Sequence, residues 1–414
     1  VLVGVATIFR IALPAGIPAG RVTVRSPWPA VMLHHGGLEH SPTHPPSTAL
    51  ILFGVAISAF GGALTALVFN LAPSPVAIAE GPVDAGLRAY MLRVYNWMAS
   101  GLLLYGMSLV YGATGSLHLP AIFDATGTAL RGGGDQRLLL LTGVVFMVAG
   151  VAFKLGAAPF HMWLPDVYQG APTPVTLFIS AAPKLAAFGM AFRLLQDGVG
   201  PAAAQWQWLL AGLAAASLVI GNVIAIAQTN LKRMLAYSTV SHVGFLLVGF
   251  AGGGEVGYSA ALFYAISYAI MSAAAFGAII VLSRQGFEAD RIDDFKGLNA
   301  RNPWQAGLVL CVMASLAGVP PFLGFWAKLV VLGAAVNGGF LWLAIVGVLC
   351  AVIGAFYYLR VIKVMYFDEP VGEIPPARKD RVVPLVFGVN ALALLALGIA
   401  WNPIMAWCKL AFAG

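Results

Sequence analysis

Long runs of apolar residues, separated by short segments rich in polar residues, proline and glycine, repeat along the whole chain. Within each run the apolar residues follow one another without polar residues alternating between them, which predicts buried helices rather than half-exposed strands. A helix of about 20 such residues crosses the ~30 Å hydrocarbon core of a bilayer, and about eleven runs reach that length. The predicted spans cover approximately residues 1–20, 50–79, 89–112, 138–158, 172–195, 206–229, 232–252, 257–284, 303–333, 338–366 and 383–412.

Two of these runs contain residues that interrupt a membrane helix. The run 303–333 is too long for one straight helix and holds Pro320 and Pro321 in "GVPPFLGFWAK", so we expect it to break inside the membrane. The run 138–158 continues as "LGAAPFH", where Pro159 and small residues predict a similar break. Broken helices at corresponding positions in two halves of a chain are typical of transporters built from inverted repeats. The pattern therefore predicts an all-α polytopic membrane protein with two repeats, each containing one broken helix.

Composition agrees with this fold class and argues against others. The 414 residues are 60% hydrophobic and 9% charged, whereas soluble domains carry about 25% charged residues. The net charge of +7 does not indicate a nucleic-acid partner, because so small an excess fits loops on one side of a membrane. Cys311, Cys350 and Cys408 stand singly in apolar runs, which is typical of small core residues rather than metal ligands. The first run has no basic leader, so we expect no cleavable signal peptide.

Basic residues divide unevenly between alternate loops, and this division predicts an orientation. The richer set comprises Arg88, Lys232, Arg233, Arg284, Arg291, Lys296, Arg301, Arg378, Lys379 and Arg381, and the poorer set mainly Arg21, Arg25, Arg131 and Arg137. Cytoplasmic loops are enriched in lysine and arginine, so we expect the C-terminal Gly414 on the periplasmic side. By the same rule Lys232 and Arg233, at the start of a span, are interpreted as surface anchors.

Motifs for redox, metal or nucleotide chemistry are not found in the sequence. It contains no phosphate loop, dinucleotide fingerprint or nucleophile triad, so we expect no cofactor-binding or metal-binding residues. The segment 34–47, "HHGGLEHSPTHPPS", leaves two interpretations open. Its histidines could bind a metal, but the lack of a cysteine or an ordered carboxylate favours a flexible loop outside the membrane.

Ionisable side chains inside the predicted spans are the candidate chemistry, because a charge at the bilayer centre costs about 2.5–3.5 kcal/mol on insertion scales. Lys154 lies late in one run, Lys184 near the middle of the next, and Lys328 shortly after the double proline. Snorkelling to the membrane surface is the alternative for Lys154, whereas it is difficult from the position of Lys184. Burial disfavours the charged form of an amine, so lysines in series can take up and release protons.

Two histidines extend this set. His161 follows Lys154 by seven residues and would return to the same face if the helix continued. His242, in "AYSTVSHVGFLLVGF", could relay protons or only hydrogen-bond a neighbouring helix, and the sequence leaves both open. We predict a proton relay formed by Lys154, Lys184, Lys328, His161 and His242.

Three segments that contain these residues carry a family resemblance. They read "FKLGAAPFHMWLPDVYQGAPTPVTLFISAAPKLAAF", "QTNLKRMLAYSTVSHVGFLLVGF" and "SLAGVPPFLGFWAKLVVL". They resemble the subunit N family of antiporter-like membrane subunits in bacterial NADH–quinone oxidoreductase, respiratory complex I. The resemblance covers about residues 97–366, and "DVYQGAPTPV" is close to specific for subunit N among related subunits.

The resemblance implies a proton-translocating subunit of the membrane arm, located in the bacterial inner membrane and driven by quinone reduction elsewhere in the complex. It implies no redox cofactor in this chain, with NADH, FMN, iron–sulfur clusters and quinone bound by other subunits. The implied partners are the antiporter-like subunit M, the small subunits J and K, and the lipid bilayer.

The resemblance also implies a role for each candidate residue. Lys154 would be the central lysine on the first broken helix, and Lys184 the connecting lysine. Lys328 would be the terminal lysine on the second broken helix. His161 and His242 would belong to the hydrophilic axis that joins them.

The first 96 residues depart from the family pattern. Bacterial members usually have about fourteen spans and a glutamate on an early helix that pairs with the central lysine, whereas the matching region here has Asn70 and Leu71 and no glutamate. The acidic partner of Lys154 is therefore not identified. We expect four regions: N-terminal spans 1–96, a first repeat region 97–252 with a break near 154–161, a second repeat region 253–366 with a break near 318–328, and a C-terminal loop and span 367–414.

Two other functions stay open at this point. A subunit of a multi-subunit sodium–proton antiporter has the same helical core, although "DVYQGAP" argues against it. The missing glutamate motivates the other alternative, a scaffolding subunit that no longer pumps.

Overall fold

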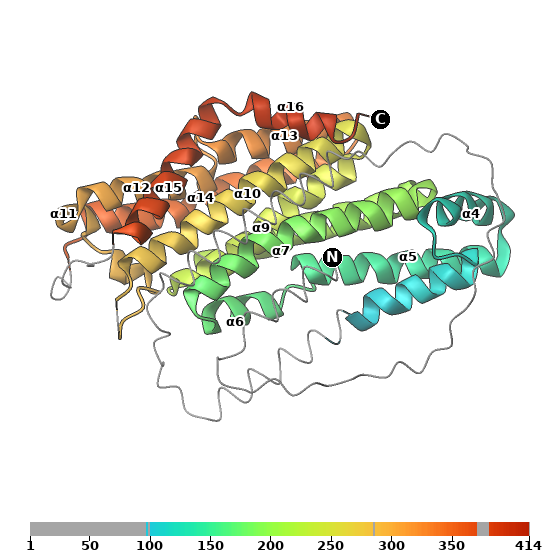
Figure 1. The fold of residues 1–414 in the computed structure, drawn as a ribbon, viewed down its shortest axis with the longest axis horizontal. Coiled ribbons are helices and arrows are strands. Elements are labelled where there is room, and N and C mark those ends of the chain that lie inside the picture. The colour runs from blue at the N-terminus through green and yellow to red at the C-terminus, as the bar shows by residue number, and fades with distance from the viewer. Residues whose placement is uncertain (1–96, 98–99, 285, 371–380, 414) are drawn as a thin grey trace, which may run out of the picture. The chain divides into compact units, whose positions relative to one another are not determined.

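A computed structural model of the chain describes residue 97 and residues 100–284, 286–370 and 381–413. The predicted spans 1–20 and 50–79, the histidine segment 34–47 and the region expected to hold the acidic partner of Lys154 lie outside the described residues. Every regular element in the described part is helical (Figure 1), which confirms the all-α fold class.

Seven helices of the described part are long and apolar enough to cross a membrane. They are α5 (Gly134–Leu155), α7 (Thr173–Phe192) with its continuation η1 (Arg193–Gly198), α8 (Ala203–Ile226) preceded by η2 (Gly200–Ala202), α9 (Leu231–Gly252), α10 (Gly254–Leu282), α14 (Leu341–Phe367) and α15 (Val382–Ile399). Shorter elements are α4 (Leu119–Gly132), α6 (Trp163–Gly170), η3 (Ile292–Phe295), α11 (Leu298–Arg301), α12 (Pro303–Ala317), α13 (Leu323–Asn337) and α16 (Asn402–Leu410), and residues 100–114 are also helical.

The structure corrects one predicted span and adds a helix that does not cross the membrane. The predicted last span, 383–412, consists of two helices, because α15 ends at Ile399 and α16 begins at Asn402. No membrane span was predicted between residues 112 and 138, and α4, which forms there, is not a span; its buried Thr126 and Ala129 face the protein. Its apolar positions are too few for a membrane span, so hydropathy alone does not reveal it.

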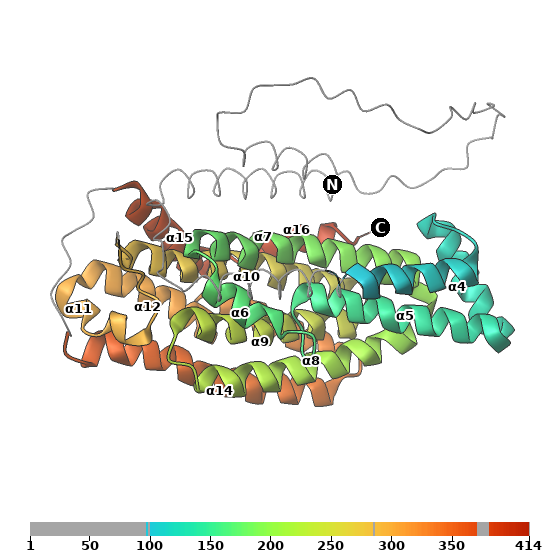
Figure 2. The ribbon, with the colours of Figure 1, turned by 90° about the horizontal axis from the view of Figure 1, so that it is seen from below.

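Helix α9 lies in the centre of the described helices and is buried along almost its whole length. It packs against α6, α8, α10 and α13, and α14 runs along the side of α8 (Figure 2). Small residues allow α8 and α9 to approach closely: a Cβ atom on Gly221 would lie 2.6 Å from the backbone nitrogen of Ser241. Because α9 is enclosed, polar side chains on it must find partners on neighbouring helices.

Both predicted helix breaks are present. The first separates α5 from α6, and the second separates α12 from α13. Each first half ends with a left-handed glycine, Gly156 with φ 82° and Gly318 with φ 88°, a conformation that glycine adopts without steric cost. The N–H of each glycine bonds back into its helix. The last carbonyl groups of α5 and α12 consequently have no helical N–H partners.

Candidate functional site

A buried lysine binds a free carbonyl at the first break. Lys184 of α7 is 3% exposed, and its Nζ donates a hydrogen bond to the carbonyl oxygen of Leu155, the last residue of α5. The ring of Trp163 lies 5.7 Å from the same Nζ, a distance typical of a cation–π contact. The ammonium group thus sits at the negative end of the α5 dipole, where a positive charge is favoured.

The second break has the same arrangement with a different lysine. Lys328 of α13 is 8% exposed, and its Nζ donates hydrogen bonds to the carbonyl oxygens of Leu316 at 2.9 Å and Ala317 at 2.8 Å. The ring of Phe245 lies 5.5 Å from this nitrogen. Both broken helices therefore end on a buried ammonium group.

Lys154, the predicted central lysine, lies in the last turn of α5 and is exposed. It is close enough to Lys184 for their charges to interact, so the structure brings these two predicted residues together. Among the carboxylates of the described residues, none forms a salt bridge with Lys154.

His161 lies in the segment between α5 and α6 and is half-buried. Its ring meets the ring of Tyr237 edge-on, with centroids 6.2 Å apart, and lies within interaction range of the Pro159 backbone. The helical spacing from Lys154 does not apply, because α5 ends at Leu155 before reaching this position. The described structure does not join His161 to the lysines by hydrogen bonds.

His242 is buried in α9 between two tyrosines of neighbouring helices. Its Nδ1 lies 2.7 Å from the hydroxyl of Tyr264 on α10, and its Nε2 lies 3.1 Å from the hydroxyl of Tyr358 on α14. A neutral imidazole donates from one nitrogen and accepts at the other, so a proton can enter on one side and leave on the other. His242 is also within electrostatic range of Lys328.

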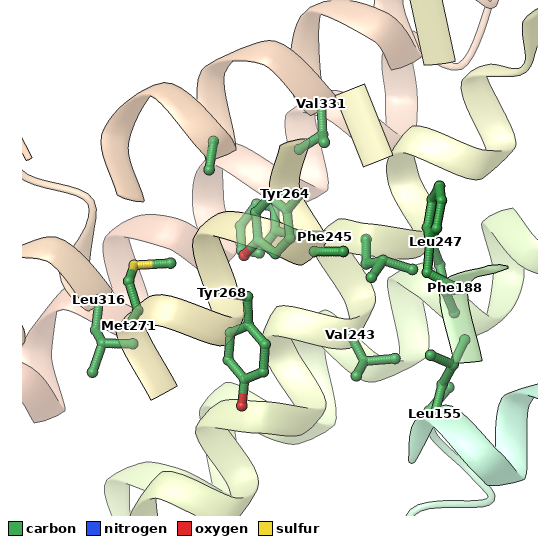
Figure 3. Close-up of a cluster of buried hydrophobic side chains, with 14 of the residues drawn as sticks. Leu155, Phe188, Val243, Phe245, Leu247, Tyr264, Tyr268, Met271, Leu316 and Val331 are labelled. Atoms are coloured by element: carbon green, nitrogen blue, oxygen red, sulfur yellow. The ribbon is translucent and has the colours of Figure 1, made fainter. Parts of the chain in front are cut away.

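Tyrosine and threonine hydroxyls extend the polar groups around His242. The hydroxyl of Tyr268 donates to Thr239 Oγ1 at 2.7 Å, and its ring lies 4.9 Å from the His242 ring. Figure 3 shows Tyr264 and Tyr268 with Phe245 among the surrounding apolar side chains. The Phe245 ring stacks on Tyr264 with centroids 5.8 Å apart and also contacts Lys328.

Further buried polar groups join α8 and α14 to this cluster. Asn222 of α8 donates to Ser241 Oγ at 3.0 Å and accepts from the Tyr357 hydroxyl at 2.9 Å. Tyr357 packs on Tyr358 with ring centroids 4.4 Å apart, and the Tyr358 hydroxyl forms a hydrogen bond with the Ser238 hydroxyl.

Sequence reasoning missed the buried tyrosines, because an aromatic residue in an apolar span resembles ordinary packing. The i, i+4 spacing of Tyr264 and Tyr268 on one helical face was an available signal.

The interpretation of Lys232 as a surface anchor is wrong. Lys232 is fully buried, and its Nζ donates to the Ala171 carbonyl at 2.7 Å and pairs with Glu288 at 3.2 Å. Arg233 agrees better with the prediction, since it is half-exposed and pairs with Asp166 at 2.9 Å. One position along α9 therefore separates a buried charge from a surface charge.

The described residues contain no group of three or more histidine, cysteine, aspartate or glutamate side chains that could hold a metal ion. Cys350 and Cys408 are buried and Cys311 is half-buried, and all three are free thiols. Their positions fit the core role predicted for them.

Long apolar helices, two of them broken and each break closed by a buried lysine, define a multi-pass membrane protein of the antiporter-like class. The family described as NADH:quinone oxidoreductase/Mrp antiporter, TM matches residues 78–354, and the chain belongs to this family. The resemblance noted from the sequence is thereby confirmed.

Individual relatives agree with this assignment. NADH-quinone oxidoreductase subunit N of Xanthomonas euvesicatoria pv. vesicatoria is 72% identical over 331 residues, covering 80% of this chain and 66% of that protein. The subunit N of Acidithiobacillus ferrooxidans is 51% identical over 372 residues, covering 88% of this chain and 76% of that protein. The chain thus spans about two thirds of the length of the Xanthomonas relative.

A solved structure of respiratory complex I from Thermus thermophilus with bound aureothin contains a similar chain. The two chains superpose with a TM-score of 0.65 at 30% sequence identity, covering 86% of this chain and 75% of that chain.

Proposed function

We propose that this chain is a proton-translocating membrane-arm subunit, subunit N, of a bacterial NADH–quinone oxidoreductase. The observation that carries the proposal is the placement of Lys184 and Lys328, two buried ammonium groups bound to the free carbonyls of two broken helices. The similarity to subunit N of Xanthomonas euvesicatoria and of Acidithiobacillus ferrooxidans supports the same assignment.

The breaks supply a physical reason for proton transfer. A buried ammonium group needs compensating partners, and here those partners are carbonyl oxygens at helix ends. A small displacement of either half-helix removes the carbonyls and disfavours the charged form of the lysine. The lysine then gives its proton to an acceptor and becomes a neutral amine, and it is reprotonated when the contact returns.

Proton transfer between the two lysines runs through the polar centre of the protein. His242 lies within electrostatic range of Lys328 and bonds two tyrosine hydroxyls. Lys154 acts with Lys184 at the first break. His161, in the segment between α5 and α6, is the remaining member of the proton relay. In this proposal His242 relays protons through its hydrogen bonds to the tyrosine hydroxyls of α10 and α14.

The coupling energy comes from outside this chain. We assign no redox cofactor to it and place NADH, FMN, the iron–sulfur clusters and quinone in other subunits of the complex. Subunits M, J and K are the neighbours we assign in the membrane arm. We place the chain in the bacterial inner membrane with the C-terminus on the periplasmic side, because the partly exposed Arg233 and Lys296 belong to the loops that are richer in basic residues.

Alanine substitution in the assembled complex tests the proposal. We expect Lys328→Ala and Lys154→Ala to leave assembly intact and to lower quinone reductase activity and proton pumping together. Pumping is measured in proteoliposomes, with Lys409→Ala, at an exposed lysine of α16, as the control. Wild-type pumping by an assembled Lys328→Ala complex would contradict the proposal.

A sodium–proton antiporter subunit is the alternative function, because the family description names Mrp antiporters together with the oxidoreductases. Sodium-dependent transport without NADH oxidation, measured on vesicles that contain the native assembly, would favour it.

A further inference from the structure

A buried ion pair, separate from the lysines of the two breaks, lies where α6 ends and α7 begins. The Lys232 side chain is 1% exposed and the Glu288 side chain 19% exposed, with Nζ and Oε1 3.2 Å apart. Glu288 lies in the loop after α10, and its Oε1 also accepts a hydrogen bond from Thr173, the first residue of α7. The carboxylate therefore reaches solvent on one side and contacts a buried ammonium group on the other.

The neighbouring pair provides a contrast at the same membrane face. Arg233 and Asp166 form an ion pair one residue further along α9, but their side chains are 32% and 60% exposed. Such a surface pair contributes little and contacts no buried hydroxyl group that is described. Burying a charged group such as the Lys232 ammonium group is costly unless it is well paired. Anchoring at the membrane surface therefore does not explain the position of Lys232.

Hydroxyl groups continue inward from the buried pair along α6 and α9. Lys232, Thr239 and His242 follow one another at positions i, i+7 and i+10 on α9, which lie on one face of a helix. Tyr168 of α6 is fully buried, and its hydroxyl is within electrostatic range of Thr239. Thr239 in turn accepts from Tyr268, whose ring packs on His242.

Two of the buried hydroxyls on this route have unused hydrogen-bonding capacity. Tyr168 Oη and Ser272 Oγ make no hydrogen bond of ordinary geometry with any described residue, although they lie within interaction range of the side chains of Thr239 and Tyr268 respectively. Buried polar groups are nearly always hydrogen-bonded, and where no protein partner exists an internal water is the usual one. Water molecules are therefore the additional partners that these hydroxyls can accept.

We infer that Glu288 and the hydroxyls of Tyr168, Thr239 and Tyr268 form a water-bridged proton entry route to the polar cluster around His242. The route rests on the proposed function and adds to it a site where protons from bulk water are loaded. Hydronium protonates the Glu288 carboxylate and leaves a water molecule. The carboxylic acid then passes its proton to a water on the route, which regenerates the carboxylate beside Lys232. Each hydroxyl accepts one proton as it donates another, so no bond is gained or lost overall.

Tyr168→Phe in the intact complex is the sharpest test, because it removes one hydroxyl that makes no hydrogen bond of ordinary geometry with a described residue. If the hydroxyl has no role beyond packing, the variant keeps wild-type pumping, since an unpaired buried polar group only costs stability. The entry route instead requires a loss of roughly tenfold in the pumping rate in proteoliposomes, the change that about 1.4 kcal/mol in a barrier produces. Tyr258→Phe is the matched control, because it removes a hydroxyl that bonds Gln196 away from this route and is expected to pump normally.

Glu288→Gln provides an independent test at the entrance. Glutamine keeps an oxygen acceptor for Thr173 and Lys232 but cannot bind and release a proton, so we expect pumping to fall while assembly is retained. Glu288→Asp should restore most of the rate, and Asp166→Asn, in the surface pair, should leave it unchanged. Wild-type pumping in assembled Tyr168→Phe and Glu288→Gln complexes would overturn the entry route. If Lys328→Ala still abolishes pumping in that case, the proposed function stands and only the route is wrong.

Discussion

The two broken helices use the same backbone arrangement, but they obtain their lysines from different parts of the chain. At the first break the ammonium group comes from the following helix, where Lys184 reaches one carbonyl. At the second break it comes from the second half of the broken helix itself, where Lys328 reaches two carbonyls. When the two breaks are aligned on their left-handed glycines, Lys154 of the first break corresponds to Leu316 of the second. The first break thus has two like charges close together, and the second has one charge that binds two carbonyl groups.

This difference teaches that a free helix end, rather than a particular lysine position, is the shared feature of the two breaks. The carbonyls at a helix C-terminus favour a cation from any direction that packing allows. Lys154 and Lys184 are close enough for their like charges to interact across the first break. The second break has no such neighbour among the described lysines.

Arginine at either break should produce the largest loss of function. In Lys184→Arg and Lys328→Arg the cation can still bind the carbonyls, but arginine does not release its proton. We expect assembly to be retained and the pumping rate to fall on the order of 100-fold at both breaks. If either arginine variant pumps like the wild type in proteoliposomes, a fixed cation is sufficient at that break, and the relay interpretation fails there.

Lys154→Leu makes the first break resemble the second. Lys154 is exposed, so we expect normal assembly, with quinone reductase activity and pumping lowered together by roughly tenfold. The double variant Lys154→Leu with Lys184→Arg should lose no more than Lys184→Arg alone, because the two residues act as one unit. Independent, multiplying losses in these assays would show that the lysines do not act together.

The number of carbonyls bound at each break predicts a difference in stability. Replacement of Lys328 by methionine leaves two carbonyls without a donor, and replacement of Lys184 leaves one. Each unsatisfied buried group costs about 1–3 kcal/mol, while the loss of a buried charge offsets part of the cost equally at both breaks. The unfolding midpoint of the purified complex, followed by thermal denaturation, should therefore fall further for Lys328→Met. A larger fall for Lys184→Met would contradict this comparison.

Alanine at the glycine of the second break should have the smallest effect. A Cβ atom on Gly318 would lie 3.1 Å from Lys328 Nζ, in a backbone conformation with φ 88°, and the strain costs about 1 kcal/mol. Gly339, with φ 83° and open space around its Cβ position, is the matched control. We expect both alanine variants to lose similar stability, but only Gly318→Ala to pump more slowly. Equal pumping rates would show that contact with the lysine is unimportant.

Lys232 and Arg233 illustrate why parts of the site could not be predicted. Adjacent in sequence and identical in charge, they look like one basic cluster at the start of a span. Successive residues on a helix point about 100° apart. Lys232 therefore turns inward to the junction between α6 and α7, while Arg233 turns to the exposed side of α6 and pairs with Asp166. Only the packing of α6 and the loop after α10 around α9 makes one of them a buried charge.

The spans between about residues 134 and 367, the two breaks and the presence of lysines inside them could be predicted from the sequence. These features depend on hydropathy and on local backbone preferences of proline and glycine, which act within a few residues. Only the tertiary structure decided which carbonyl each lysine binds and which tyrosines lie on both sides of His242. It also decided the burial of Lys232 and the separation of α15 from α16. They depend on how neighbouring helices are rotated toward one another, and residues far apart along the chain set that rotation jointly through packing.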